Sequence, residues 1–217
     1  MEIAVFIYDG MTALDAIGPY EILSRLPDAR LRFVAEEKGE VRTDTGALGI
    51  LADAAIEEVD HADLVLVPGG PGDEHVRETP RVLDWLRARH EQTRFTTSVC
   101  TGSLILAKAG ILDGVRATTH WARMDVLATL GAKPVKQRWV EDGKLVTAAG
   151  VSAGIDMALH LAAKIAGEPL AKIVQLGLEY DPQPPFDVGS PDKAPADLIE
   201  LARSASTARR EEVRRQL

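Results

Sequence analysis

The only cysteine of the chain, Cys100, stands where an apolar run gives way to a helix-prone one. The run Phe95–Val99 is typical of a buried strand and residues 101–109 are typical of a helix, so the thiol falls at the start of that helix. Unpaired N–H groups and the helix dipole favour negative charge there, and we expect them to lower the thiol pKa. The pattern Ser98-x-Cys100-x-Gly102 is similar to a nucleophile elbow. We predict a nucleophile; the alternative is an inert cysteine that packs as a small hydrophobe.

Two glycines, Gly69 and Gly70, follow another apolar run, Leu64–Val67, in a turn rich in Gly and Pro. In an open α/β sheet, ligands bind beyond the carboxyl ends of the strands, and Cys100 lies at such an end as well. We therefore expect N–H groups of Gly70 and of the Cys100–Thr101 corner to converge on a developing anion. A plain tight turn is the structural alternative.

A carboxylate in apolar surroundings, Asp15, follows the first predicted strand in the stretch Leu14-Asp-Ala-Ile-Gly-Pro19. It caps a helix or it serves the site. If it faces Cys100, an ionised carboxylate opposes the thiolate, whereas a protonated one donates a hydrogen bond to it. The sequence leaves both possibilities open.

The histidines do not form a recognisable catalytic or metal-binding pattern. Thr101, not His, follows Cys100, so the Cys–His pair typical of acyl transfer is absent at that position. His120 ends a short strand predicted over residues 116–119, and it either lines the same sheet edge or is structural. No H-x-x-x-H spacing or Cys/His cluster predicts a metal site, and no phosphate-binding glycine motif predicts a nucleotide cofactor.

The elements that position these residues alternate between strand and helix, which predicts an α/β fold with a largely parallel sheet. Apolar runs predict buried strands, and residues 41–51 and 137–147 read as hairpin-like segments. Amphipathic or apolar stretches predict helices over residues 12–26, 80–92, 101–109, 121–130, 153–166, 169–178 and 196–216.

The chain of 217 residues has 46% hydrophobic residues and a formal net charge of −8. This composition supports a sizeable core and gives nucleic-acid binding no electrostatic help. The N-terminus lacks the charged and apolar regions of a signal peptide, and no apolar stretch reaches the ~20 residues of a membrane span. A single cysteine forms no internal disulfide. We expect a cytoplasmic protein without nucleic-acid or membrane partners.

Five prolines fall within residues 181–195, which read as an irregular strap before the last helix. We expect an α/β domain over residues 1–180, with the strap and C-terminal helix of residues 181–217 packed on that same domain.

These motifs together resemble the ThiJ/PfpI superfamily over nearly the whole chain. Its isonitrile hydratase branch is the most similar in its motifs, which in this chain read Ser98-Val-Cys-Thr-Gly-Ser103, Ala117-Thr-Thr-His-Trp121, Ala153-Gly-Ile-Asp156, Gln175-Leu-x-Leu-Glu-Tyr180, Pro184-Pro-Phe186 and Gly189-Ser-Pro-Asp192. The cysteine motif also occurs in the related domain of AraC-type regulators, so the proline-rich strap is the more discriminating feature.

The resemblance implies a flavodoxin-like three-layer sandwich, usually a homodimer, with the cysteine at a strand-to-helix elbow. It implies that Cys100 is the nucleophile, Asp15 the proton-handling carboxylate and Thr101 an accessory polar group. Superfamily members with His directly after the cysteine are linked to peptidase or deglycase activity, and Thr101 departs from that pattern.

We expect hydration of a small apolar isonitrile to the N-substituted formamide through a covalent thioimidate on Cys100, without a cofactor. Gly69, Gly70 and His120 are the expected substrate or oxyanion contacts. The alternatives are a ligand-sensing domain related to AraC-type regulators and a glyoxalase- or chaperone-like stress protein of the same superfamily.

Overall fold

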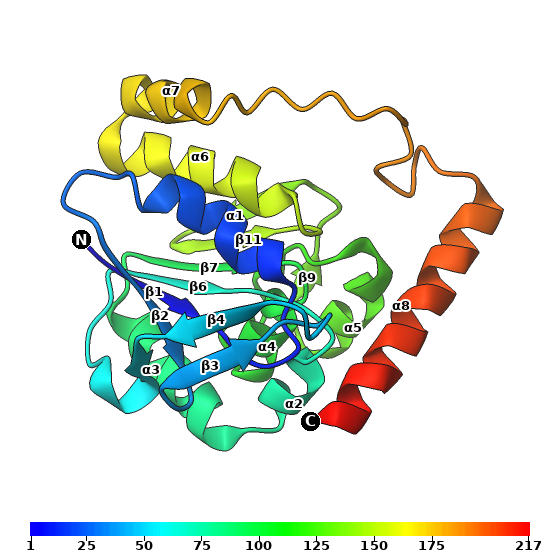
Figure 1. Ribbon diagram of the computed structural model, residues 1–217, viewed down its shortest axis with the longest axis horizontal. Coiled ribbons are helices and arrows are strands. Elements are labelled where there is room, and N and C mark those ends of the chain that lie inside the picture. The colour runs from blue at the N-terminus through cyan, green and yellow to red at the C-terminus, as the bar shows by residue number, and fades with distance from the viewer.

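The computed structural model describes residues 1–217 and places a seven-stranded sheet at the centre of the molecule (Figure 1). The strand order is β10-β11-β7-β6-β1-β2-β5, and every neighbouring pair is parallel except the β10–β11 hairpin. The strands are β1 (Glu2–Phe6), β2 (Arg30–Ala35), β5 (Ala54–Ala55), β6 (Leu64–Val67), β7 (Phe95–Val99), β10 (Trp139–Asp142) and β11 (Leu145–Ala148). The predicted mostly parallel α/β fold is confirmed.

Helices cover both faces of this sheet, which explains why its central strands β1, β6 and β7 are buried along almost their whole length. On one face α1 (Ala13–Leu23) and α7 (Glu168–Gly177) both pack against α6 (Ala153–Ala166). The other face carries α2 (Asp73–Arg77), α3 (Pro80–Gln92), α4 (Gly102–Lys108) and α5 (Met124–Thr129) (Figure 1). Single-turn 3₁₀ helices occupy Ile56–Glu58 and Trp121–Arg123.

Two small sheets lie outside the central one. The antiparallel pair β3 (Gly39–Arg42) and β4 (Gly49–Ala52) forms the hairpin predicted over residues 41–51. The parallel pair β8 (Arg116–Ala117) and β9 (Lys133–Pro134) replaces the longer strand predicted over residues 116–119. The sequence analysis also missed α2, a five-residue helix that follows the glycine-rich turn.

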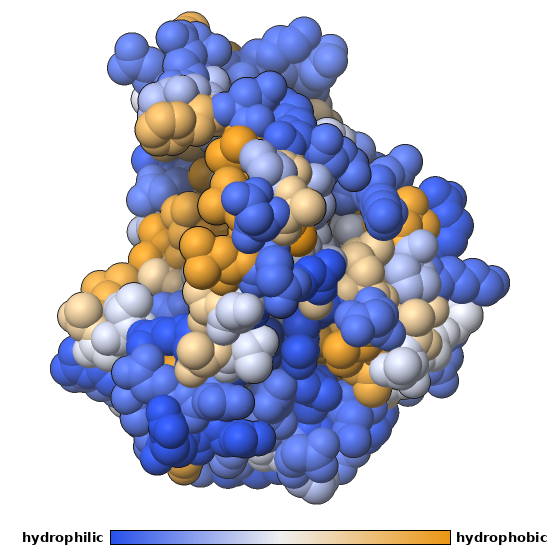
Figure 2. Space-filling model, turned by 90° about the vertical axis from the view of Figure 1, so that its right-hand side faces the viewer, coloured by the Kyte–Doolittle hydropathy of each residue, from blue (hydrophilic) through white to orange (hydrophobic).

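The C-terminal segment differs from the rest of the chain in how it contacts the body. Residues 181–189 are all exposed, and α8 (Ala196–Gln216) stands at the side of the sandwich (Figure 1). Near its end α8 buries Val213, which is 2% exposed and packs at Gly10, in the loop after β1. Figure 2, which views the side that carries α8, shows hydrophobic patches within a mostly hydrophilic surface. Exposed large hydrophobic side chains of the strap and α8 are Phe186, Val188, Leu198, Leu201 and Leu217.

No helix is long and apolar enough to cross a membrane.

Candidate active site

Cys100 occupies a strained corner between β7 and α4. Its φ of +57° lies in the left-handed region that non-glycine residues rarely adopt. The corner is held by the Cys100 N–H, which donates to the carbonyl oxygens of Ala148 at 3.1 Å and Ala149 at 2.8 Å. After the corner, a Cβ on Gly102 would lie 2.0 Å from the Val67 carbonyl oxygen, so only glycine fits there. The structure thus has the strand-to-helix elbow that the sequence predicts.

The loop of Gly69 and Gly70 lies directly against this elbow. A Cβ on Gly69 would lie 2.3 Å from the Thr101 nitrogen and 2.9 Å from the Cys100 Cβ. Gly70 has a φ of +139°, and a Cβ there would lie 2.4 Å from the Thr12 nitrogen. Both positions require glycine because the loop backbone itself fills the space between the elbow and the loop before α1.

The N–H groups of Gly69 and Gly70 already donate to side chains of the protein, which corrects the anion-binding role predicted for Gly70. The Gly69 N–H donates to Asp15 Oδ2 at 2.9 Å, and the Gly70 N–H donates to Thr101 Oγ1 at 2.9 Å. The Cys100 N–H is bonded to β11, as described above. The N–H groups that lower the pKa of the Cys100 thiol are those of Thr101, within the predicted Cys100–Thr101 corner, and of Val151. The glycine loop therefore orients Asp15 and Thr101, while Thr101 and Val151 supply the amide donors.

Asp15 lies in the first turn of α1 and is fully buried. It is not the helix cap, since Thr12 holds that position and Asp15 makes no capping contact. Its Oδ2 accepts from Gly69, while its Oδ1 has no hydrogen-bond partner. Burial raises the pKa of this carboxyl to about 7, against the opposing effects of the Gly69 N–H and of the neighbouring Cys100 thiol. A carboxyl with this pKa is partly protonated at neutral pH.

The thiol of Cys100 is itself buried, with 5% of the residue exposed. Burial raises the pKa of this thiol well above its usual value, and the Asp15 charge adds to the rise. The Thr101 and Val151 N–H groups lower it by less. The prediction of a lowered pKa is wrong in direction, because desolvation at this packed corner outweighs the amide dipoles. The thiol and Asp15 form a coupled pair in which the state of one decides the charge of the other.

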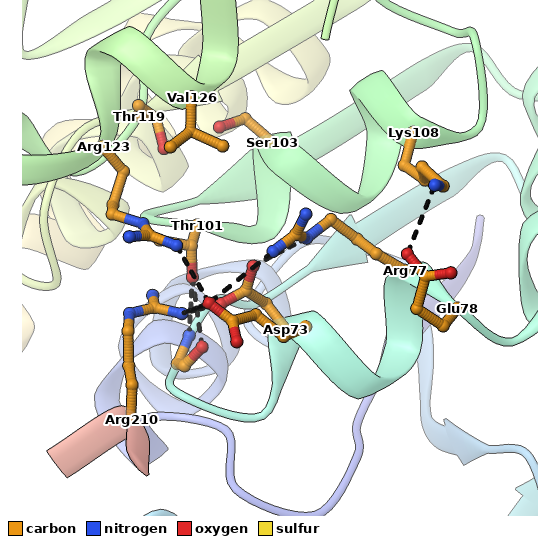
Figure 3. A network of polar contacts seen from close by, with 12 residues as sticks. Asp73, Arg77, Glu78, Thr101, Ser103, Lys108, Thr119, Arg123, Val126 and Arg210 are labelled. Carbon is orange, nitrogen blue, oxygen red and sulfur yellow. Dashed lines mark hydrogen bonds and ion pairs between the residues drawn. The ribbon is translucent and has the colours of Figure 1, made fainter. Parts of the chain in front are cut away.

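A second buried carboxylate, Asp73, lies on the α2 side of the site and was missed by the sequence analysis. Its carboxylate is fully buried and pairs with Arg77 at 3.1 Å and with Arg210 of α8 (Figure 3). Burial raises its pKa, and Arg210 and Arg77 oppose that rise. The only sequence signal was an acidic residue opening a short helix after a glycine-rich turn, and nothing local indicated its arginine partner.

His120 packs against Gly150, where an added Cβ would lie 3.0 Å from its Cδ2, and no hydrogen bond joins it to Asp15 or Cys100. It precedes the turn Trp121–Arg123 and is not on a strand, contrary to the prediction. Burial lowers its pKa to about 4, with help from Arg210, Arg123 and Arg203. His120 is therefore neutral at physiological pH.

A cavity of about 770 Å³ opens next to this corner. Cys100 is not among its lining residues, but two residues that hydrogen-bond its backbone are: Thr119, whose hydroxyl donates to the Cys100 carbonyl at 2.9 Å, and Ala149, whose carbonyl accepts from the Cys100 N–H at 2.8 Å. The strap forms another wall with Gly189–Asp192. Only four of the 18 lining residues are hydrophobic. The cavity therefore lies beside the backbone of the Cys100 corner, and its lining is mainly polar.

No group of three or more His, Cys, Asp or Glu residues lies close enough together to hold a metal ion.

Comparison with known proteins shows the family to which this fold and site belong. The model of the DJ-1/PfpI family matches residues 1–164, and the chain belongs to that family, which confirms the resemblance seen in the sequence. The chain is 46% identical to an isonitrile hydratase from Pseudomonas putida over 94% of this chain and 89% of that protein. It is also 33% identical to the HTH-type transcriptional regulator CdhR from Pseudomonas aeruginosa, over 74% of this chain and 48% of the regulator.

A solved structure agrees with the whole architecture, including the C-terminal segment. The crystal structure of a ThiJ/PfpI family protein from Pseudomonas syringae has a TM-score of 0.90 and 36% identity. The match covers 98% of this chain and 89% of that one, whereas the family model ends at residue 164. The match to this relative therefore extends over the strap and α8, although both lie beyond the residues that the family model matches.

Proposed function

We propose that this chain is an isonitrile hydratase, which adds water to an isonitrile, R–N≡C, to give the N-substituted formamide. The observation that carries the proposal is the pairing of the single cysteine, on its elbow, with a buried carboxyl whose Oδ1 has no partner. The 46% identity with the Pseudomonas putida isonitrile hydratase, over almost the full length of both chains, supports the substrate class.

The first half of the reaction joins the Cys100 sulfur to the terminal carbon of the isonitrile. Asp15 takes the thiol proton as the thiolate attacks that carbon, and then returns the proton to the same carbon. The product is a thioimidate, R–N=CH–S–Cys100, and no proton is lost. A carboxyl with a pKa of about 7 suits both the acceptance and the return of this proton.

The second half uses one water molecule and restores the thiol. Water attacks the thioimidate carbon, giving its proton to Asp15, and the nitrogen receives a proton in return. The tetrahedral carbon then forms its carbonyl and expels the Cys100 thiolate, which is reprotonated. The amide N–H groups of Thr101 and Val151 face the sulfur and stabilise it while it carries negative charge.

Thr101 acts in this scheme by holding the loop. Its Oγ1 accepts from the Gly70 N–H at 2.9 Å and donates to the Gly70 carbonyl at 3.3 Å. Both interactions are with the glycine backbone, which supports a positioning role rather than proton transfer. The mostly polar cavity lining accommodates a polar group on the isonitrile nitrogen better than the apolar group expected from the sequence.

The decisive experiment measures formamide formed from a simple alkyl isonitrile by the wild-type protein and by Cys100→Ala. We expect turnover by the wild type and none above background by the variant, and a wild-type adduct of the substrate mass on intact-protein mass spectrometry. Consumption of methylglyoxal without formamide formation would instead favour the glyoxalase-like alternative.

We also propose a cytoplasmic homodimer. Exposed apolar side chains on α7 and the strap, Ile173, Leu176 and Phe186, support a covered surface in solution. A nucleophilic thiol without a second cysteine suits a reducing compartment. Light scattering at micromolar concentration is expected to give twice the chain mass; a monomer mass would contradict the dimer.

A further inference from the structure

The C-terminal helix α8 reaches the active-site side of the molecule through one buried side chain, Arg210. Its guanidinium pairs with the carboxylate of Asp73, and 11% of the Arg210 side chain and none of the Asp73 side chain is exposed. In Figure 3, Arg210 projects from α8 toward Asp73, which Arg77 approaches from α2. This ion pair joins residues 137 positions apart in the sequence.

A short chain of hydrogen bonds connects this ion pair to the thiol corner. The backbone N–H of Asp73 donates to the Gly70 carbonyl at 3.1 Å. The same carbonyl accepts from the Thr101 hydroxyl at 3.3 Å, and the Gly70 N–H donates back to that hydroxyl at 2.9 Å. Thr101 follows Cys100 and supplies one of the amide donors to its sulfur. By holding Asp73 in place, the Arg210 side chain therefore also holds the Gly69–Gly70 loop, which lies against the Cys100 elbow.

The ion pair also sets the charge around the thiol. The groups that act on Cys100 are Asp15 from α1, Tyr8 after β1, Asp73 from α2 and Arg210 from α8. Those that act on Asp73 are Arg77 on its own helix, Arg123 before α5 and Arg210. Glu74 lies 3.6 Å from Arg210 and 3.0 Å from Arg123, so part of the positive charge is already shared. Without Arg210, the site would hold two buried carboxylates near a thiol that must ionise.

We propose that Arg210 is a positioning residue of the active site: through its ion pair with Asp73 it holds the Gly70–Thr101 contact and offsets a negative charge that opposes the Cys100 thiolate. The proposal rests on the proposed function for its catalytic consequence, while the effect on the thiol is independent of the substrate. It makes α8 a part of the reaction centre, although α8 lies outside the matched family region.

The test is the pH dependence of alkylation by iodoacetamide, which reports on one site because the chain has a single cysteine. Removing the positive charge in Arg210→Met is expected to slow alkylation at pH 7.5 about threefold, because the thiolate fraction falls as the thiol pKa rises. Removing the negative charge in Asp73→Asn is expected to speed alkylation by a similar factor. The double variant, with both charges removed, is expected to return close to the wild-type rate.

Opposite shifts for the two single variants support the proposal. Two single variants whose alkylation rates shift in the same direction would overturn it, because a merely structural ion pair loosens the corner whichever partner is removed. Alkylation midpoints that stay at the wild-type pH in both variants would also overturn it. Arg210→Lys keeps the charge and is expected to restore most of the wild-type profile; it also serves if Arg210→Met does not fold. Arg209→Met, next to Arg210 but paired with Glu212, is the matched control and is expected to leave the profile unchanged.

Formamide production by the same variants then separates the two hypotheses. A wild type that alkylates as described but does not hydrate isonitriles would contradict the proposed function and leave the role of Arg210 at the thiol intact. If the wild type is active and Arg210→Met titrates normally, the inference about Arg210 is wrong and the proposed function stands.

Discussion

Two helix starts flank the Cys100 elbow, and each carries a fully buried aspartate with a different set of partners. Asp15, in the first turn of α1, receives one backbone hydrogen bond and leaves Oδ1 without a partner. Asp73, at the start of α2, pairs with Arg77 and Arg210. Two guanidinium groups favour the ionised form of Asp73 and fix its position, whereas burial brings the pKa of Asp15 to about 7, which suits the proposed proton transfer.

The comparison teaches that burial alone does not make a catalytic carboxylate. Both side chains are out of contact with solvent, and burial raises the pKa of both. What differs is the set of hydrogen-bond and charge partners, which leaves Asp15 free to act on the thiol and ties Asp73 to the scaffold.

The largest expected difference is in turnover. Asp15→Asn removes the carboxyl proposed to transfer protons to and from Cys100 and should lower kcat for isonitrile hydration by about 10²–10⁴-fold. Asp73→Asn, which leaves Asp15 in place, should cost less than tenfold. Steady-state kinetics with one alkyl isonitrile checks both, and equal losses in the two variants would contradict the assignment of distinct roles.

The glycine loop links the two helix starts, so a change there should disturb the site without touching either carboxylate. Gly69→Ala places a Cβ within 2.3 Å of the Thr101 nitrogen and beside the Cys100 Cβ. The displaced corner should lower kcat/KM by about 10²-fold, a typical cost of misplacing reacting groups by ~1 Å.

Gly177→Ala is the control for that change, because no heavy atom lies within 4 Å of the added Cβ at the end of α7. Its kinetics should match the wild type. Wild-type kinetics in Gly69→Ala would show that the loop does not hold the corner.

The sequence predicted much of the frame around these residues. Strand Phe95–Val99 and helices Ala153–Ala166 and Ala196–Gln216 lie where the apolar pattern and the flanking Gly and Pro residues place them. It missed α2, since five residues are too few for a helical period to register. The Asp73–Arg210 pair could not be predicted for another reason. The two residues are 137 positions apart in the sequence, and only the packing of α8 brings them together.

Within the site, the sequence predicted residue types better than their electrostatics. The approach of Asp15, Gly69, Gly70 and Thr101 to Cys100 follows from the rule that the ends of parallel strands share one edge. The direction of the thiol pKa could not be obtained in this way. It depends on how completely the neighbouring helices exclude water, which is a property of the assembled core.

The two aspartates should also act on stability with opposite sign at alkaline pH. The folded-state pKa of Asp15 lies near 7 and its unfolded value near 3.8, so the protonated form favours folding and this contribution is lost as pH rises from about 4 to 7. Asp15→Asn removes that loss and should be more stable than the wild type at pH 8 by on the order of 4 kcal/mol, with little difference at pH 4.

Asp73→Asn should instead destabilise the fold at pH 8, because it leaves the buried Arg210 without its carboxylate. Urea unfolding of the three proteins at pH 4, 6 and 8 measures both effects. A stability gap between Asp15→Asn and the wild type that does not change with pH would show that Asp15 is ionised throughout this range.

The smallest expected effect on stability and turnover comes from a buried, unpartnered oxygen that takes no part in the proposed reaction. Ser98, on β7 two residues before Cys100, also has a buried side-chain oxygen without a hydrogen-bond partner. Ser98→Ala removes that unsatisfied group at little cost in volume and should change the free energy of unfolding by less than about 0.5 kcal/mol while leaving kcat unchanged. A loss of turnover in Ser98→Ala as large as that in Asp15→Asn would contradict this distinction. It would mean that any unpartnered oxygen next to Cys100 contributes to the reaction, whether or not it belongs to a carboxyl group.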